Sequence, residues 1–289
     1  MSKKKEVDDV SGTETTGHEW DGIKELNTPL PRWWVVIFIA TIVWAVGYWI
    51  VMPAWPLVHG YTHGILNHSQ RDTVTANVNA LKAARAAREH ALDHASLKQI
   101  QDNPELLQFA MAEGKSVFGD NCAPCHGDGG QGAHGYPNLN DDVWLWGGKL
   151  EDIQHTITVG VRSGAPDTRE SQMPAFGRDA ILKPGEIEDL TQYVVHLSGR
   201  RADAGAVRRG GKLFAGNCAA CHGPEGRGER KVGAPNLTDN EWLYGGAPEN
   251  IHDQIWNGHG GVMPTWGGRL TRETIKSLAV YVHSLGGGE

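Results

Sequence analysis

Two short cysteine motifs determine the fold of this chain: Cys122-Ala-Pro-Cys125-His126 and Cys218-Ala-Ala-Cys221-His222. They contain all four cysteines of the 289 residues. Two thiols three positions apart on a helical turn can form thioethers with both vinyl groups of one haem, and the adjacent histidine then becomes an axial ligand of the iron. We therefore predict two covalently attached haem c groups, with His126 and His222 as iron ligands.

Two other kinds of cysteine site fit these motifs poorly. A thioredoxin-like redox pair belongs in a βαβ setting, which the helical patterns around both motifs do not provide. A zinc ribbon separates its cysteine pairs by about 15 to 20 residues, whereas 92 residues lie between Cys125 and Cys218. Haem attachment remains the interpretation of both motifs.

The motifs lie within an internal repeat that covers most of the second half of the chain. The matched stretches are Gly114–Asn121 with Gly210–Asn217, Pro137–Leu139 with Pro235–Leu237, Trp144–Gly148 with Trp242–Gly246, and Met173-Pro174 with Met263-Pro264. Each copy closes with apolar residues at the spacing of a helix face, namely Leu190, Tyr193, Val194 and Leu197, then Leu278, Tyr281, Val282 and Leu285. The chain is a tandem duplication of a mainly α-helical unit.

The repeated Met-Pro pairs supply candidates for the second axial ligand. Met173 follows His126 by 47 residues, and Met263 follows His222 by 41 residues. A single methionine is usually a core filler, but two at equivalent positions predict His/Met ligation and a raised reduction potential. The spacing leaves open whether each methionine ligates the haem of its own copy or of the other.

Histidines are the alternative source of a sixth ligand. The candidates are His134, His155, His252 and His259. None of the four occupies an equivalent position in both copies, so bis-histidine ligation is the weaker interpretation.

A membrane anchor precedes the repeat. Residues 33–52 form a run of 20 residues without a charge, with aromatic residues at both ends, which is enough for a helix to cross a hydrocarbon core. About thirty polar residues precede the run, so a cleaved signal peptide fits less well. We predict a single transmembrane anchor over residues 32–54.

Basic residues before this anchor set its orientation, because cytoplasmic flanks are enriched in lysine and arginine. Those ahead of the uncharged run are Lys3, Lys4, Lys5, Lys24 and Arg32, and the next one after it is Arg71. We therefore expect residues 1–31 to be cytoplasmic and the chain from residue 55 onward to be periplasmic in a bacterium. Residues 55–105 read as a helical spacer, because residues 74–98 are rich in alanine, leucine, lysine and arginine.

The distribution of charge along the chain indicates which kinds of partner it can bind. The net charge of −7 and the lack of a basic stripe argue against nucleic-acid binding. Residues 106–198 carry 6 basic and 13 acidic residues, a net of −7, whereas residues 199–289 carry 11 and 9, a net of +2. This difference favours a basic donor cytochrome docking on the first copy. The alternative is docking on the second copy, which lies farther from the anchor along the chain and would be easier to reach. Both docking sites stay open.

Each copy resembles a class I cytochrome c domain, over residues 106–198 and 199–289. The resemblance rests on the glycine and phenylalanine ahead of the haem motif, Pro-Asn-Leu, Met-Pro and the aromatic closing helix. It implies that the carbonyls of Pro137 and Pro235 accept hydrogen bonds from the ligating histidines. It also implies aromatic packing within each copy, in the pairs Phe118/Tyr193 and Phe214/Tyr281.

The whole chain resembles the FixP/CcoP dihaem subunits, subunit III, of cbb3-type cytochrome c oxidases. The segment Trp20–Trp34, the single span and Pro53–Leu57 carry this likeness. It implies a bacterial inner-membrane complex with a haem-copper catalytic subunit and a monohaem cytochrome c subunit. Electrons would pass from a donor cytochrome c through this chain, which would have no catalytic centre of its own.

Two other functions remain as alternatives. A free-standing, membrane-tethered dihaem shuttle would differ from an oxidase subunit in not purifying with an oxidase. A dihaem peroxidase would need an iron with an open or displaceable sixth position, and the two Met-Pro pairs argue against that.

Overall fold

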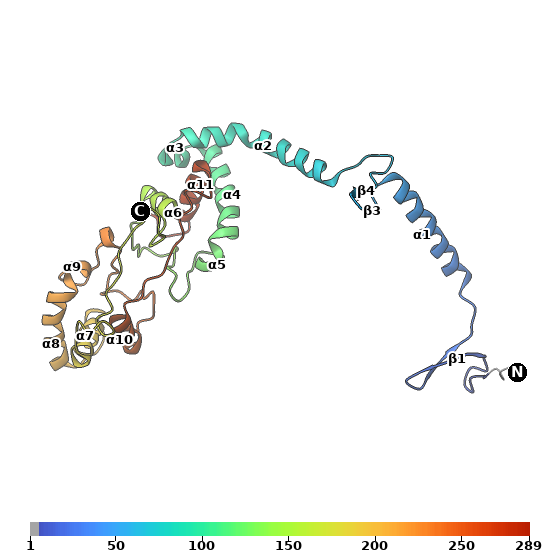
Figure 1. The fold of residues 1–289 in the computed structure, drawn as a ribbon. Helices are drawn as coiled ribbons and strands as arrows, with labels where there is room; N and C mark the ends of the chain where they lie inside the picture. The colour runs from blue at the N-terminus through green and yellow to red at the C-terminus, as the bar shows by residue number, and fades with distance from the viewer. Residues whose placement is uncertain (1–5) are drawn as a thin grey trace. The chain divides into compact units, whose positions relative to one another are not determined.

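The computed structural model describes residues 6–289 and divides the chain into two compact units, one up to Lys82 and one from Ala83 to Glu289 (Figure 1). Lys3, Lys4 and Lys5, which contribute to the predicted orientation, lie outside the described residues.

The first unit begins with a hairpin that we did not predict. Strand β1, Thr15–Trp20, pairs antiparallel with β2, Ile23–Leu26. Asp21 and Gly22 between them both have positive φ, 50° and 83°, as a two-residue hairpin turn of type I′ requires. The Asp-Gly pair was therefore a readable hairpin signal.

The predicted membrane anchor is helix α1, Arg32–Val51. Among residues 6–289 it is the one helix whose length and apolar composition suffice to cross a bilayer. None of its residues is buried within the structure, as a lipid-facing helix requires. A short hairpin of β3, Pro56–Leu57, and β4, Gly60–Tyr61, follows, and then helix α2, Gln70–His94.

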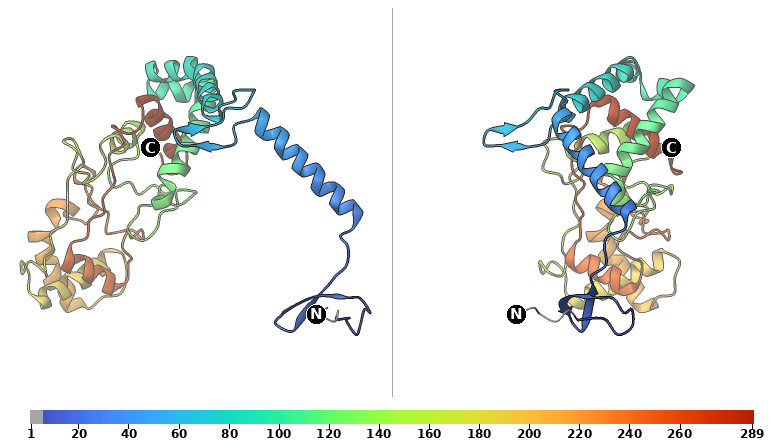
Figure 2. Two further views of the ribbon diagram at one scale, coloured as in Figure 1. Left: turned by 45° about the vertical axis from the view of Figure 1, so that its right-hand side comes forward. Right: turned by 90° about the vertical axis from the view of Figure 1, so that its right-hand side faces the viewer.

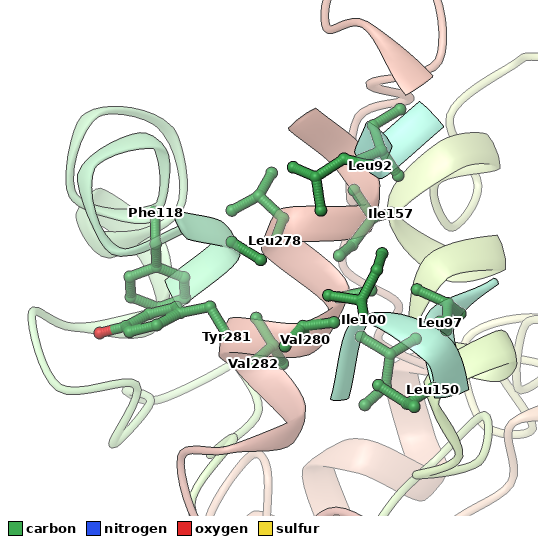
Figure 3. Close-up of a cluster of buried hydrophobic side chains, with 14 of the residues drawn as sticks. Leu92, Leu97, Ile100, Phe118, Leu150, Ile157, Leu278, Val280, Tyr281 and Val282 are labelled. Atoms are coloured by element: carbon green, nitrogen blue, oxygen red, sulfur yellow. The ribbon is translucent and has the colours of Figure 1, made fainter. Parts of the chain in front are cut away.

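The expected spacer is helical only from Gln70 onward, after the β3–β4 hairpin, and its end is not a separate element. Leu92 at the end of α2, and Leu97 and Ile100 on helix α3, Leu97–Asp102, are buried in a core with later helices (Figure 3). Lys276 Nζ donates to the backbone carbonyls of Leu92, Asp93 and Ala95, which satisfies acceptors left free at a helix C-terminus. The end of the spacer is therefore part of a packed domain that it forms with later helices of the chain.

We call the domain that contains this core the first haem body, residues 83–162 with 261–289. Its helices are α3, α4 (Pro104–Asn121), α5 (Ala123–His126), α6 (Leu150–Val159) and α11 (Arg272–His283). Helix α4 begins with a side-chain cap: Asn103 Oδ1 accepts hydrogen bonds from the amides of Glu105 and Leu106 at 3.0 and 3.2 Å. Helix α11, from the end of the chain, packs against α4 and α6.

The second haem body is contiguous in sequence, residues 163–260. Its helices are α7 (Pro184–Leu197), α8 (Ala204–Asn217), α9 (Ala219–His222) and α10 (Pro248–Asn257), with a 3₁₀ turn at Arg230–Val232. Helix α7 packs against both α8 and α10. Both views of Figure 2 show the two groups of helices at opposite ends of the second unit.

The closing helices of the two repeats are therefore exchanged, and the predicted aromatic pairs are wrong. Phe118 packs against Tyr281, with ring centroids 5.4 Å apart (Figure 3), and Phe214 packs against Tyr193 at 5.2 Å. Only six residues, 198–203, connect α7 to α8, and such a short connection makes consecutive helices neighbours. The second haem body thereby takes its closing helix from the first repeat.

Candidate haem-binding sites

Each cysteine motif forms a single helical turn at the end of a long helix. Cys122 is both the C-cap of α4 and the N-cap of α5, and the amides of Cys125 and His126 donate to its carbonyl at 3.1 and 2.9 Å. Both thiols and the imidazole line one cavity. Cys218, Cys221 and His222 repeat this arrangement at the end of α8 and line a second cavity. All four cysteines are free of disulfides.

The two motif histidines are held in a single orientation. His126 Nδ1 donates to the carbonyl oxygen of Pro137, and His222 Nδ1 to that of Pro235, each at 3.0 Å. This confirms the expectation for the two prolines. With the proton fixed on Nδ1, each Nε2 keeps its lone pair for a metal.

Burial supports the neutral form of both imidazoles. It lowers the pKa of His126 and of His222 below the usual range, against the opposing effect of the proline carbonyls. Burial, reinforced by the neighbouring cysteine of each pair, also raises the pKa of Cys122 and of Cys218 to about 11. The enclosed sides of the motifs are therefore uncharged, as suits an apolar macrocycle.

Each methionine lies in the cavity that contains the histidine of the other repeat. Met263 lines the cavity of His126, and Met173 lines the cavity of His222. Backbone hydrogen bonds fix this exchange. The Val161 amide donates to the Met263 carbonyl oxygen, and the Met263 amide donates to the Val161 carbonyl oxygen, both at 2.9 Å. Gly258 stands so close to the Met173 carbonyl oxygen that a Cβ there would lie 2.4 Å from it.

The alternative histidine ligands are less well placed. Of the four, His259 alone lines one of the two cavities, that of His222, and it is ion-paired with Asp253 at 2.6 Å. His134 is exposed and lies within hydrogen-bond distance of the Tyr244 carbonyl, at 3.1 Å. His155 and His252 line neither cavity.

The walls of both cavities suit a flat apolar cofactor. Phe118, Leu139, Trp144, Ile157 and Trp266 contribute to the first, and Phe176, Leu190, Phe214, Trp242 and Ile255 to the second. Thiols, an oriented imidazole and a thioether sulfur converge on each apolar cavity, and this donor set fits haem c. In the described residues, no cluster of three or more His, Cys, Asp or Glu side chains offers a separate metal site.

Five residues line both cavities and form a shared wall, none of which we had singled out as functional. They are Leu145, Trp146, Arg162, Leu243 and Tyr244. Four of them belong to the repeated Trp-Leu-aromatic-Gly-Gly stretch, so the repeat itself carried a signal. Arg162 has no such signal, because the equivalent position in the second repeat, 98 residues later, is Gly260.

The fold and these two sites define a c-type cytochrome with two candidate haem sites, and the comparisons with known proteins refine that class. Residues 12–59 match the family model for the N-terminal domain of cytochrome oxidase-cbb3, FixP. Residues 111–198 match the cytochrome c family, and residues 205–282 match subunit III of cbb3-type cytochrome c oxidase.

Full-length relatives agree with these matches. The chain is 57% identical to the cbb3-type cytochrome c oxidase subunit FixP of Bradyrhizobium sp. (strain ORS 278), with complete coverage of both chains. It is 54% identical to FixP of Azorhizobium caulinodans, over 98% of this chain and 96% of that protein. Its identity to subunit CcoP of Azospirillum brasilense is 50%, over 99% of each chain. The chain belongs to the FixP/CcoP family of cbb3-type cytochrome c oxidase subunits.

Proposed function

We propose that this chain carries two covalent haem c groups and serves as the membrane-anchored electron-transfer subunit of a cbb3-type oxidase. Cys122 and Cys125 would attach the first haem, ligated by His126 and Met263. Cys218 and Cys221 would attach the second, ligated by His222 and Met173. When bound, each haem supplies a reversible one-electron couple between ferric and ferrous iron.

The observation that carries the proposal is the shared wall between the two sites. Leu145, Trp146, Leu243 and Tyr244 each line both cavities, so the two proposed haems would lie on either side of this shared wall. An imidazole and a methionine sulfur would occupy both remaining ligand positions of each iron, which favours electron transfer over chemistry at an open coordination site.

The remaining parts of the proposal concern location and partners. Helix α1, with Lys24 before it and Arg32 as its first residue, would place the N-terminus in the cytoplasm and both haem bodies in the periplasm. A donor cytochrome c would deliver electrons there, for transfer to the oxidase's monohaem and catalytic subunits.

Because the closing segments of the two repeats are exchanged, the net charge of each haem body differs from that of each repeat. Counted by haem body, the first carries 9 basic and 13 acidic residues, a net of −4, and the second carries 11 and 13, a net of −2. The contrast of −7 against +2 between the repeats nearly disappears. Charge therefore favours a basic donor on both bodies and gives little preference between them.

Purification of the tagged chain from membranes tests the proposal. We expect an oxidase catalytic subunit and a monohaem cytochrome to purify with it, and its mass to correspond to two haems. A chain with two haems but no oxidase would instead support the free-standing shuttle. One haem or none, in cells competent for haem attachment, would refute the assignment of the two motifs.

A further inference from the structure

Arg162 occupies an unusual position between the two cavities. It follows α6 in the segment that crosses from the first haem body to the second, and its side chain lines both cavities. Its φ is +50°, in the left-handed region that costs a non-glycine residue free energy. An arginine held there, at the position equivalent to Gly260, suggests that its side chain has a function.

The guanidinium group is tied to both crossing segments and is not neutralised by a protein carboxylate. Nε donates to the carbonyl oxygen of Gly261 at 2.6 Å, and Nη1 donates to that of Ser171 at 2.5 Å. In the described part of the chain, these are its only hydrogen-bond acceptors, and it has no ion pair. A guanidinium has five N–H donors, so most of its donor capacity is unused.

The charges that line the two cavities indicate which groups the remaining N–H donors of Arg162 could bind. Among the described residues, Arg162 is the only Lys, Arg, Asp or Glu lining the first cavity, and only Glu241 joins it in the second. Each haem brings two propionate carboxylates, so two haems would bring four carboxylates into cavities whose only lysine or arginine, among residues 6–289, is Arg162. Arginine is the side chain best suited to carboxylates, which it can bind through two parallel hydrogen bonds.

We propose that Arg162 is a shared cationic anchor that binds a propionate carboxylate from each of the two haems. This inference rests on the proposed function, because it requires both sites to hold haem. An anionic propionate near the iron stabilises the ferric state, and Arg162 offsets that effect at both sites. Its removal should therefore lower both reduction potentials together.

The test is a redox titration of the purified full-length protein with Arg162→Gln, Arg162→Lys and, as control, Arg178→Gln. Arg178 is exposed, pairs with Asp179 and lines neither cavity. In a medium of effective dielectric about 20, two unit charges about 10 Å apart change an equilibrium constant roughly tenfold. For a one-electron couple that is about 59 mV.

We expect Arg162→Gln to lower both potentials by about this amount and to shift the propionate bands of the resonance Raman spectrum. Arg162→Lys, which keeps the charge, should stay closer to the unmodified protein, and Arg178→Gln should match it. Unchanged potentials in Arg162→Gln, a shift at only one haem, or an equal loss in Arg162→Lys would overturn the proposal. If Arg162→Gln does not fold, Arg162→Lys becomes the test, because lysine keeps the positive charge. Lowered potentials in Arg162→Lys would then refute the proposed effect of that charge.

Haem content separates this inference from the proposed function. Mass and the sulfur-to-iron absorption band are measured first on the unmodified protein. Fewer than two haems there would refute the proposed function, and with it this inference. Two haems with normal methionine ligation, followed by unchanged potentials in Arg162→Gln, would refute the role of Arg162 alone.

Discussion

Gly114 of α4 lies directly against Ser277 of α11: a Cβ at Gly114 would stand 2.5 Å from the Ser277 carbonyl oxygen. The two residues are 163 positions apart and come from different repeats. In the second haem body, Gly210 of α8 stands in the same way against Asp189 of α7, at 2.2 Å. Glycine at these two positions lets the first and closing helices of each body approach closely.

Replacing Gly114 by alanine should therefore destabilise the first haem body. We expect the added methyl group to force α4 and α11 apart, at a cost of about 1–3 kcal/mol in the free energy of unfolding. Gly119→Ala is the matched control in the same helix, because a Cβ there would meet nothing within 4 Å. It should be neutral or stabilise the helix by up to about 1 kcal/mol. Denaturant unfolding of both proteins measures the difference, and equal effects would contradict the observed packing.

The contiguous second haem body should fold as an independent fragment. We expect residues 163–260, secreted in cells that attach haem, to bind one haem with His222 and Met173 as ligands. A fragment of residues 199–289 corresponds to the second repeat. It lacks α7 and Met173 and should show no methionine ligation. Mass and visible spectra of the two fragments check this, and His/Met spectra from the 199–289 fragment alone would argue for packing within each repeat.

The end of the spacer should be needed for a stable soluble protein. A secreted protein starting at residue 55 or at residue 83 retains Leu92, Leu97 and Ile100, and we expect it to be soluble, to carry two haems and to be redox-active. A protein starting at residue 104 loses three side chains that are at most 4% exposed. Burial of such side chains contributes about 1.5–3 kcal/mol each, so its melting temperature should fall clearly. Equal melting temperatures for the three truncated proteins would refute this role.

The longest of these truncated proteins also tests the anchor. The protein starting at residue 55 lacks α1, and we expect it to transfer electrons in solution but not to support oxidase activity in membranes. Full recovery of oxygen consumption would show that the anchor is dispensable.

Gln254 should raise the potential of the second haem. Its Nε2 lies 3.9 Å from Met173 Sδ and donates to the His259 carbonyl, while its Oε1 is buried without a partner. A hydrogen bond to the sulfur draws electron density from the iron and favours the ferrous state. Gln254→Leu should lower that potential by up to about 59 mV, a tenfold change in the equilibrium constant. A potentiometric titration measures this, with Thr156→Val, at the equivalent position of the other repeat, as the control. An unchanged potential in the leucine variant would exclude the effect.

Much of the fold could be predicted because its signals are local. Asn103-Pro104 marks the start of α4 through capping, and the closing helices follow from apolar spacing. The haem motifs were equally local, since spacing within one turn places two thiols and an imidazole on one cavity. The hairpin at Asp21-Gly22 was also locally encoded, although we did not interpret it.

The pairing of the helices could not be predicted from contact chemistry. Phe118 and Phe214 are the same residue type, as are Tyr193 and Tyr281, so both ways of pairing bury the same side chains. The six-residue connection between α7 and α8 favours the observed pairing, but the resemblance to separate domains favoured the other. The role of Arg162 could not be predicted from the sequence for a related reason. Its position between the two cavities is defined only by the packing of the two haem bodies.

The exchange of methionines between repeats is the central claim, and one measurement tests it most directly. With Cys122 and Cys125 both replaced by alanine, the protein should keep only the haem attached at Cys218 and Cys221. In that background we predict that Met173→Leu abolishes the sulfur-to-iron absorption band and lowers the potential, whereas Met263→Leu leaves both unchanged. Loss of the band in Met263→Leu and its retention in Met173→Leu would contradict the account.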